Sequence, residues 1–309
     1  MPFQMKDLSM STSWNFRKAN SGRELINQLL AFGFSQVELN YQVKAEWLPE
    51  IYEIVKRGEV KISSVHNVFP KTYDEAYGTD SVLLGYEGET MRAEAVRLGK
   101  ISIDHAAALG AKAVVFHPTE VPLGPEKYDK PLKKLIASGK RNSEEFETLV
   151  AEMRINRLAS PYLSQMMKSI EELASYVENN HLPVKLGMEN RAMCHQIPWY
   201  SEFELIAERF DGSPAGIWID TGHGIMMQEM GLQALPLKPI VVRNLVGMHI
   251  HDAANALDHY APCTLPGDVL SPFRSYIEQS PIKVLELSGR LTPKEVQTGI
   301  QNFLRQYAQ

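Results

Sequence analysis

Short apolar runs alternate with longer amphipathic stretches along almost the whole chain. The short runs are bounded by turn residues, which is typical of buried β-strands. In the longer stretches apolar residues recur every three or four positions, which is the period of an α-helix. The pattern predicts eight strands, over Asp7–Ser13, Gln36–Leu39, Lys61–His66, Ala113–His117, Val184–Glu189, Gly216–Asp220, Val246–His251 and Lys283–Leu287.

Helices are expected between these strands and after the last one. They cover Ser21–Phe32, Trp47–Arg57, Thr90–Leu109, Ser160–Asn180, Ser201–Arg209, Ser271–Glu278 and Thr292–Tyr307. Eight strand–helix repeats in 309 residues predict an α/β fold, a single (β/α)8 TIM barrel whose one domain covers residues 1–309. A doubly wound parallel sheet is the alternative, but it would more often use fewer strands.

Two long connections interrupt the alternation. One, Asn67 to Gly88, follows the third strand, and the other, Thr119 to Ala159, follows the fourth. The second contains several prolines and the basic stretch Lys127–Arg141, so we expect a loop insertion with room for a short helix. Because both leave from strand C-termini, they would overhang the active face as lids or as contacts in a homo-oligomer. A solvated surface insertion explains the basic stretch equally well.

Composition favours a small-molecule partner. A net charge of −5 gives no electrostatic reason to expect nucleic acid or an anionic membrane as partner. The first residues lack a signal-peptide pattern, and no apolar run is long enough to span a membrane. Two cysteines, Cys194 and Cys263, are too few for a disulfide framework. We therefore expect a cytoplasmic protein.

Polar groups stand at the ends of six consecutive predicted strands. They are His66, His117, Glu189, Asp220 with His223, His249 with His251 and Asp252, and Glu286. Any one of them is more often a hydrogen-bonded core residue. In a parallel barrel, however, all six strand ends meet at one face, where converging carboxylates would repel one another without a cation.

Four of these residues form an oxygen-rich ligand set. Glu189, Asp220, His249 and Glu286 follow one another at gaps of 31, 29 and 37 residues, about one repeat per step. Three carboxylates and one imidazole suit one divalent metal ion, Mn²⁺ or Mg²⁺ before Zn²⁺ or Co²⁺. Such a site would be near neutral and would leave positions for two substrate oxygens.

The whole series resembles the xylose isomerase-like TIM barrel superfamily. Its parts are the strand-ending histidines and Glu189, the DTGH motif ending at His223, the HIHD motif ending at Asp252, PGD at 266–268, and Glu286. That superfamily includes sugar epimerases of the D-tagatose 3-epimerase type, hydroxypyruvate isomerase, inosose dehydratase and endonuclease IV. The resemblance covers nearly all of the chain outside the two long connections.

The resemblance implies roles for these residues. Glu189, Asp220, His249 and Glu286 would hold the metal, and the two glutamates would also act as catalytic acid and base. His223 would contact substrate oxygens, and His66 and His117 lie where endonuclease IV members bind a further zinc. We expect His66, His117, His223 and Arg191 to bind substrate, in a reaction that removes a proton beside a carbonyl and forms an enediolate.

This chain departs from the family in two places. Asn255 stands six residues after His249, where many of the sugar epimerases have a substrate-binding arginine. Arg191 and Arg290 are candidates to replace it or to bind a substrate anion, or they form ordinary ion pairs. Counting back from Pro266 puts Ala261 and Cys263 where endonuclease IV has an Asp-x-His pair for its third zinc, although Asp258 and His259 lie nearby.

These observations favour a metal-dependent isomerase or epimerase acting on a sugar, polyol or hydroxy-ketone. A lyase of the inosose dehydratase kind is the near alternative, followed by an abasic-site endonuclease and by a barrel that binds without turnover. The sequence lacks the glycine-rich motifs that bind nucleotides, so no nucleotide cofactor is expected. Glu38, on the second strand, is expected to be a structural partner of a group at the barrel mouth.

Overall fold

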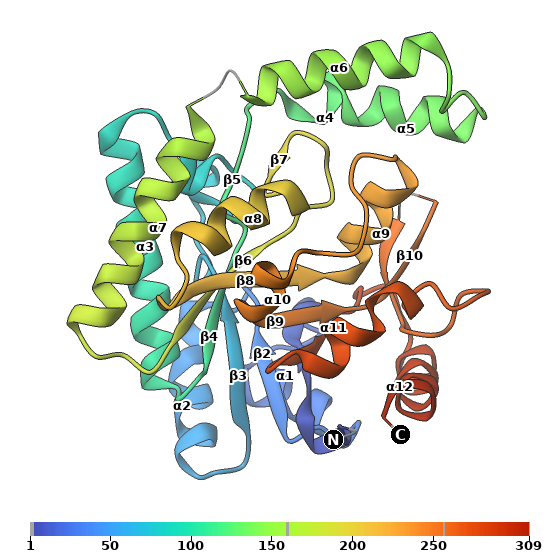
Figure 1. Cartoon of the computed structure of the whole chain (residues 1–309). Helices are drawn as coiled ribbons and strands as arrows, with labels where there is room; N and C mark the ends of the chain where they lie inside the picture. Colours follow the sequence, from blue (N-terminus) through green and yellow to red (C-terminus); the bar gives the residue numbers. More distant parts are fainter. Residues whose placement is uncertain (1–2, 159–160, 256, 309) are drawn as a thin grey trace.

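Eight parallel strands close into a barrel at the centre of the molecule (Figure 1). The computed structural model describes residues 3–158, 161–255 and 257–308. Around the barrel the strand order is β1-β12-β9-β8-β6-β4-β3-β2, which confirms the predicted TIM barrel. The strands are β1 Leu8–Ser11, β2 Gln36–Leu39, β3 Lys61–His66, β4 Ala113–Phe116, β6 Lys185–Glu189, β8 Ala215–Asp220, β9 Leu245–Ile250 and β12 Lys283–Leu285.

Helices cover the outside of the barrel, and α3 and α7 pack side by side along one flank (Figure 1). The helices are α1 Gly22–Leu30, α2 Leu48–Lys56, α3 Glu89–Ala108, α4 Gly124–Lys127, α5 Asp129–Ala137, α6 Glu144–Leu158, α7 Tyr162–Asn179, α8 Tyr200–Arg209, α9 Thr221–Glu229, α10 Pro239–Arg243, α11 Arg274–Gln279 and α12 Pro293–Tyr307. Helix α12 begins as its sequence indicates, with Thr292 capping the backbone N–H of Glu295. No helix of the described residues is long and apolar enough to cross a membrane.

One tryptophan of β8, Trp218, packs in a buried cluster with residues of β4, β9 and β12. Trp218 is fully buried, and glycines on the two neighbouring strands make room for its ring. A Cβ atom at Gly187 would lie 2.9 Å from the ring, and one at Gly247 only 2.2 Å from it. Successive strand residues alternate between the two faces, so the residues two positions further on also point inward. On β6, β8 and β9 these residues are Glu189, Asp220 and His249.

The insertion after β4 is helical, and the expectation of a loop with room for a short helix was wrong. Beyond the short strand β5, Thr119–Glu120, which pairs with β7, Gln196–Ile197, it forms α4, α5 and α6. Pro125 and Pro131 fall within the first turns of α4 and α5, where a missing N–H is tolerated. The expected boundary between insertion and next helix, Ala159 and Ser160, lies outside the described residues.

Helices α4 to α6 have a hydrophobic core of their own, which continues onto the barrel. Tyr128, Leu132 and Phe146 pack in one cluster with Trp199 and Met227. In Figure 1 these three helices lie together beyond β5 and β7, at one end of the barrel. We refer to residues 124–158 as the helical cap. The other long connection, after β3, contains only two 3₁₀ turns, Glu75–Tyr77 and Leu83–Gly85.

Candidate metal centre and substrate cavity

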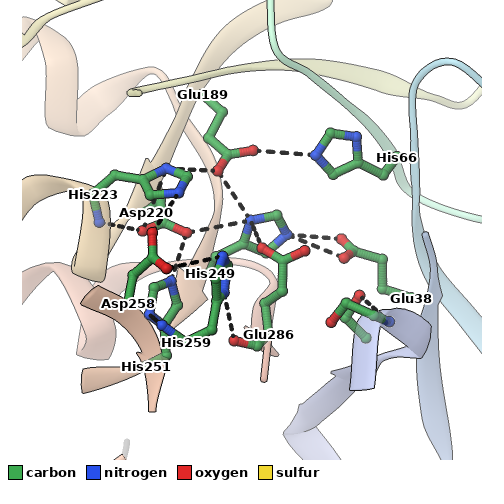
Figure 2. Close-up of polar contacts among 12 residues, drawn as sticks. Glu38, His66, Glu189, Asp220, His223, His249, His251, Asp258, His259 and Glu286 are labelled. Atoms are coloured by element: carbon green, nitrogen blue, oxygen red, sulfur yellow. Dashed lines mark hydrogen bonds and ion pairs between the residues drawn. The ribbon is translucent and has the colours of Figure 1, made fainter. Parts of the chain in front are cut away.

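The four residues expected to bind metal converge at the C-terminal ends of β6, β8, β9 and β12 (Figure 2). One ligand atom of each lies within 4.8 Å of those of the others, and all four residues are buried. The Nδ1 atom of His249 lies 3.3 Å from Glu189 Oε1 and 3.0 Å from Glu286 Oε2. It lies 3.7 Å from Asp220 Oδ2. Glu189, Asp220, His249 and Glu286 therefore surround one point.

Unpaired atoms at this point fit a cation. Both carboxylate oxygens of Glu189 and the Nδ1 atom of His249 are buried and make no hydrogen bond within the described part of the chain. Leaving buried polar atoms unpaired is costly, so such groups usually have a ligand or another partner. Oxygens and one imidazole nitrogen are the donors that a hard or borderline divalent ion takes. The residues present therefore fit the expected metal.

Electrostatics keep Glu189 and Asp220 ionised. Burial acts to raise the pKa of Glu189, but the charges of His117 and His249 outweigh it and hold the pKa well below the usual value. In the same way His223 and His251 outweigh the effect of burial on Asp220 and lower its pKa. Burial acts to lower the pKa of His249, but Glu286, Glu38 and Glu189 raise it well above normal. Without a metal, histidine protons thus balance the carboxylates.

The DTGH segment begins helix α9 directly at the end of β8. Asp220 is the N-cap of α9, and its Oδ1 accepts the backbone N–H of His223 at 2.7 Å. Gly222 is required here because a Cβ atom would lie 2.0 Å from the ring of His251. That closeness lets His251 Nε2 reach Asp220 Oδ2 at 2.9 Å.

His66 and His117 form a second ligand group with Glu189. Their Nε2 atoms lie 3.4 Å and 3.1 Å from Glu189 Oε2. The other ring nitrogen of His117, Nδ1, lies 2.9 Å from Asp80 Oδ1, which also contacts Arg191 Nη2 at 2.5 Å. Sequence analysis missed Asp80, because it lies inside a long connection and belongs to no motif.

A third ligand group consists of His223, Asp258 and His259. Counting back from Pro266 indicates Ala261 and Cys263 for this group, with Asp258 and His259 nearby, and the latter pair is the one that lies beside His223. Asp258 and His259 belong to β11, Leu257–Tyr260, which pairs with β10, Asp252–Ala254, in a hairpin that has a register irregularity. Asp258 Oδ2 lies 3.7 Å from His223 Nε2. A residue count cannot reveal such an irregularity.

A cavity of about 340 Å³ borders these groups. Its lining includes Tyr41, Asp80, His117, Arg191, His223 and Glu286, together with Pro125 of the helical cap. Of the two arginines considered as substrate ligands, only Arg191 is among these lining residues. Arg191 is buried beside the cavity, whereas Arg290 is exposed in a groove near the start of α12 and binds Ser288 Oγ at 3.1 Å.

Comparisons with known proteins agree with the fold and identify the family. The sequence profile of the family described as xylose isomerase-like TIM barrel matches residues 26–306, so the chain belongs to that family. No curated protein sequence matches the chain.

Solved structures with the same fold have low sequence identity to this chain. A D-tagatose 3-epimerase-like protein has a TM-score of 0.62 and 14% identity over 97% of this chain and 96% of its own. The 3-keto-D-glucoside 4-epimerase of E. coli has a TM-score of 0.63 and 14% identity over 97% of this chain and 99% of its own. Endonuclease IV from Thermus thermophilus has a TM-score of 0.57 and 13% identity over 97% of this chain and 98% of its own. At such identity the similarity establishes the shared fold.

Proposed function

We propose that this member of the xylose isomerase-like TIM barrel family is a divalent-metal-dependent isomerase or epimerase of a sugar or polyol. The observation that carries the proposal is the convergence of Glu189, Asp220, His249 and Glu286 on one point, where buried ligand atoms make no hydrogen bond to any described residue. A divalent ion bound there, Mn²⁺ or Mg²⁺ by preference, would stabilise negative charge that develops on substrate oxygens. The names of the structural neighbours, which include sugar epimerases, support the same class of reaction.

Glu189 and Glu286 are the proposed base and acid. They reach His249 Nδ1 from the ends of β6 and β12, at 3.3 Å and 3.0 Å, so they approach the centre from different strands. One glutamate removes the proton from the carbon beside the carbonyl, and the other returns a proton to the resulting enediolate. General acid–base catalysis of this kind contributes about 10²–10⁴-fold.

The cavity supplies the remaining contacts. His117, Arg191 and His223 line it and are proposed to bind substrate oxygens. His66, also expected to bind substrate, is not among the lining residues and packs against His117, with ring centroids 4.5 Å apart. A volume of about 340 Å³ is at the small end of ligand sites and suits a single sugar ring. A small polar substrate agrees with the hydrogen-bonding lining.

Hydrogen exchange tests the reaction. Metal-loaded protein is incubated in D₂O with a panel of ketoses, aldoses and inososes, and we expect deuterium at a carbon next to the carbonyl. The Glu286→Gln variant should lose this exchange. Loss of water from an inosose would identify a lyase instead. Absence of exchange with every member, in protein with a full complement of metal, would refute the isomerase and leave a binding function.

Metal content is a separate test. Elemental analysis of the purified protein should find one divalent ion per chain, and clearly less in Glu286→Gln, which removes one ligand. Equal contents well below one per chain in both proteins would exclude the assignment of these ligands.

A second candidate, an abasic-site endonuclease, is favoured by one observation. Three possible ligand groups lie close together, and two of them share Glu189. The first contains His66 and His117, the second Asp220, His249 and Glu286, and the third His223, Asp258 and His259. Several neighbouring metals suit hydrolysis of a phosphodiester. Against it stands the net charge of −5, because DNA binding depends on lysine and arginine contacts to phosphate.

Incision of duplex DNA that carries an abasic site distinguishes the two candidates. With excess Zn²⁺ at low salt, where such binding is strongest, we expect no incision. Efficient incision that disappears in Glu189→Ala would replace the isomerase by the nuclease.

A further inference from the structure

A buried carboxylate supports the metal-facing histidine from behind. The Nε2 atom of His249 lies 3.1 Å from each carboxylate oxygen of Glu38, and both side chains are fully buried. The opposite ring nitrogen, Nδ1, faces Glu189, Asp220 and Glu286 (Figure 2). A neutral imidazole has one N–H and one lone pair. An acceptor at Nε2 therefore keeps the proton there and leaves the lone pair of Nδ1 toward the metal centre.

Glu38 is itself held in place by β3. The Ser64 hydroxyl donates to Glu38 Oε2 at 2.8 Å. Between β2 and β3 the register shifts, so that Val37 pairs with Ile62 while Glu38 pairs with Ser64, and Ser63 is skipped. An extra residue of this kind redirects the side chains next to it. The irregularity thereby places a hydroxyl beside the carboxylate.

The energetic cost of this arrangement points to a function. A carboxylate with no exposed surface loses its hydration, and an apolar residue of similar size would usually serve the fold as well or better. Glu38 has no exposed surface and is not among the residues that line the cavity. The interaction that remains for it is with His249.

We propose that Glu38, held by Ser64, is a positioning residue that fixes the ring orientation and the N–H of His249 and so sets the affinity for the metal. This inference rests on the proposed function, because it requires a metal at His249. In metal sites generally, replacing the group that holds a histidine ligand weakens metal binding about 10- to 100-fold.

Calorimetric titration with Mn²⁺ tests the role of Glu38. Metal-free wild type is compared with Glu38→Leu, Glu38→Gln and Ser64→Ala, after thermal melts show that each is folded. We expect a loss of about 10- to 100-fold in affinity for Glu38→Leu. The loss in Glu38→Gln should be smaller, because the amide oxygen still accepts the N–H, and the loss in Ser64→Ala smaller again.

Ser169→Ala is the matched control for Ser64→Ala. Ser169 lies on the outer helix α7, and its fully buried hydroxyl donates to the Leu84 carbonyl at 2.8 Å. Because this hydroxyl is remote from His249, its removal should not change the Mn²⁺ affinity. A second measurement is the proton spectrum of Zn²⁺-loaded protein, in which the hydrogen-bonded Nε2–H of His249 should give a downfield signal. That signal should shift in Glu38→Gln.

The outcomes separate this inference from the proposed function. If the wild-type protein binds no Mn²⁺ or Zn²⁺ at this site, both the proposed function and the role of Glu38 are refuted. Wild type that binds metal, together with folded Glu38→Leu of equal affinity, would overturn only the role of Glu38. If the leucine variant does not fold, the glutamine variant decides, and unchanged affinity with an unshifted N–H signal would refute the proposal.

Discussion

The Oδ1 atom of Asp220 accepts the backbone N–H of His223 at 2.7 Å, while its Oδ2 atom lies 3.7 Å from His249 Nδ1. One side chain thus caps the first turn of α9 and faces the candidate metal centre. Capping needs only an oxygen acceptor, whereas attraction to a cation needs the charge. The two roles can therefore be separated by substitution.

Asp220→Asn should keep the cap and lose the metal. Asparagine caps helices as well as aspartate, but it removes one negative charge from the centre. We expect both Asp220→Asn and Asp220→Ala to lose most of the bound metal. In the metal-free state, Asp220→Ala should be less stable than Asp220→Asn by about 0.5–2 kcal/mol. Urea unfolding with added chelator measures this, and equal stability of the two would contradict the capping role.

Metal affinity should rise with pH. Burial acts to lower the pKa of His249, but three carboxylates raise it well above normal, so the metal-free ring carries a proton that the metal must displace. The pKa of Glu189 is held well below normal, so that carboxylate has no proton to lose. The affinity for the metal should therefore rise by up to ~10-fold per pH unit over the range in which binding releases one proton. Titrations at several pH values, in two buffers of different ionisation enthalpy, measure the release, and pH-independent affinity would contradict it.

Arg191→Lys should weaken substrate binding without loss of metal. Arg191 is buried, and its guanidinium contacts Asp80 at 2.5 Å, which leaves other donors of the planar group for substrate. Lysine cannot reproduce that geometry. Hydrogen bonds from charged groups contribute about 1.5–3 kcal/mol, so kcat/KM should fall at least ~10-fold, mainly through KM. Arg290→Lys, an exposed site outside the cavity, is the control, and equal kinetics of the two variants would refute the assignment.

A buried ion pair joins the helical cap to the barrel. Arg157 of α6 contacts Glu202 of α8 at 2.9 Å and 3.1 Å, and both residues are buried. Glu202→Leu removes the carboxylate that accepts two hydrogen bonds from the buried guanidinium and should destabilise the protein by about 3–5 kcal/mol. The double variant Arg157→Leu/Glu202→Leu should recover much of that loss. Urea unfolding of both proteins tests this, and a double variant no more stable than the single one would argue against the pair.

Much of the fold could be predicted because its signal is local. Each strand is marked by its own apolar run, and the predicted strand ends differ from the observed ones by at most two residues. The inward direction of Glu189, Asp220 and His249 follows from the alternation of faces within each strand. Parallel strands then bring these ends to one side of the barrel, so the convergence of the candidate ligands could be expected from the sequence.

The surroundings of the site were decided by contacts between distant segments. Asp80 reaches His117 and Arg191 across 37 and 111 residues, from a connection with no periodic pattern. Asp258 and His259 of the β10–β11 hairpin lie beside His223, where counting from Pro266 indicates Ala261 and Cys263.

The sequence by itself determined which residues stand at the strand ends, because periodicity is a property of each segment. Only the tertiary structure decided that Arg191 and not Arg290 borders the cavity, that Glu38 supports His249 and that the insertion forms a helical cap. These choices depend on how loops, registers and buried faces of distant segments pack together. Such packing energies are shared among many residues and leave no pattern in any one stretch of the chain.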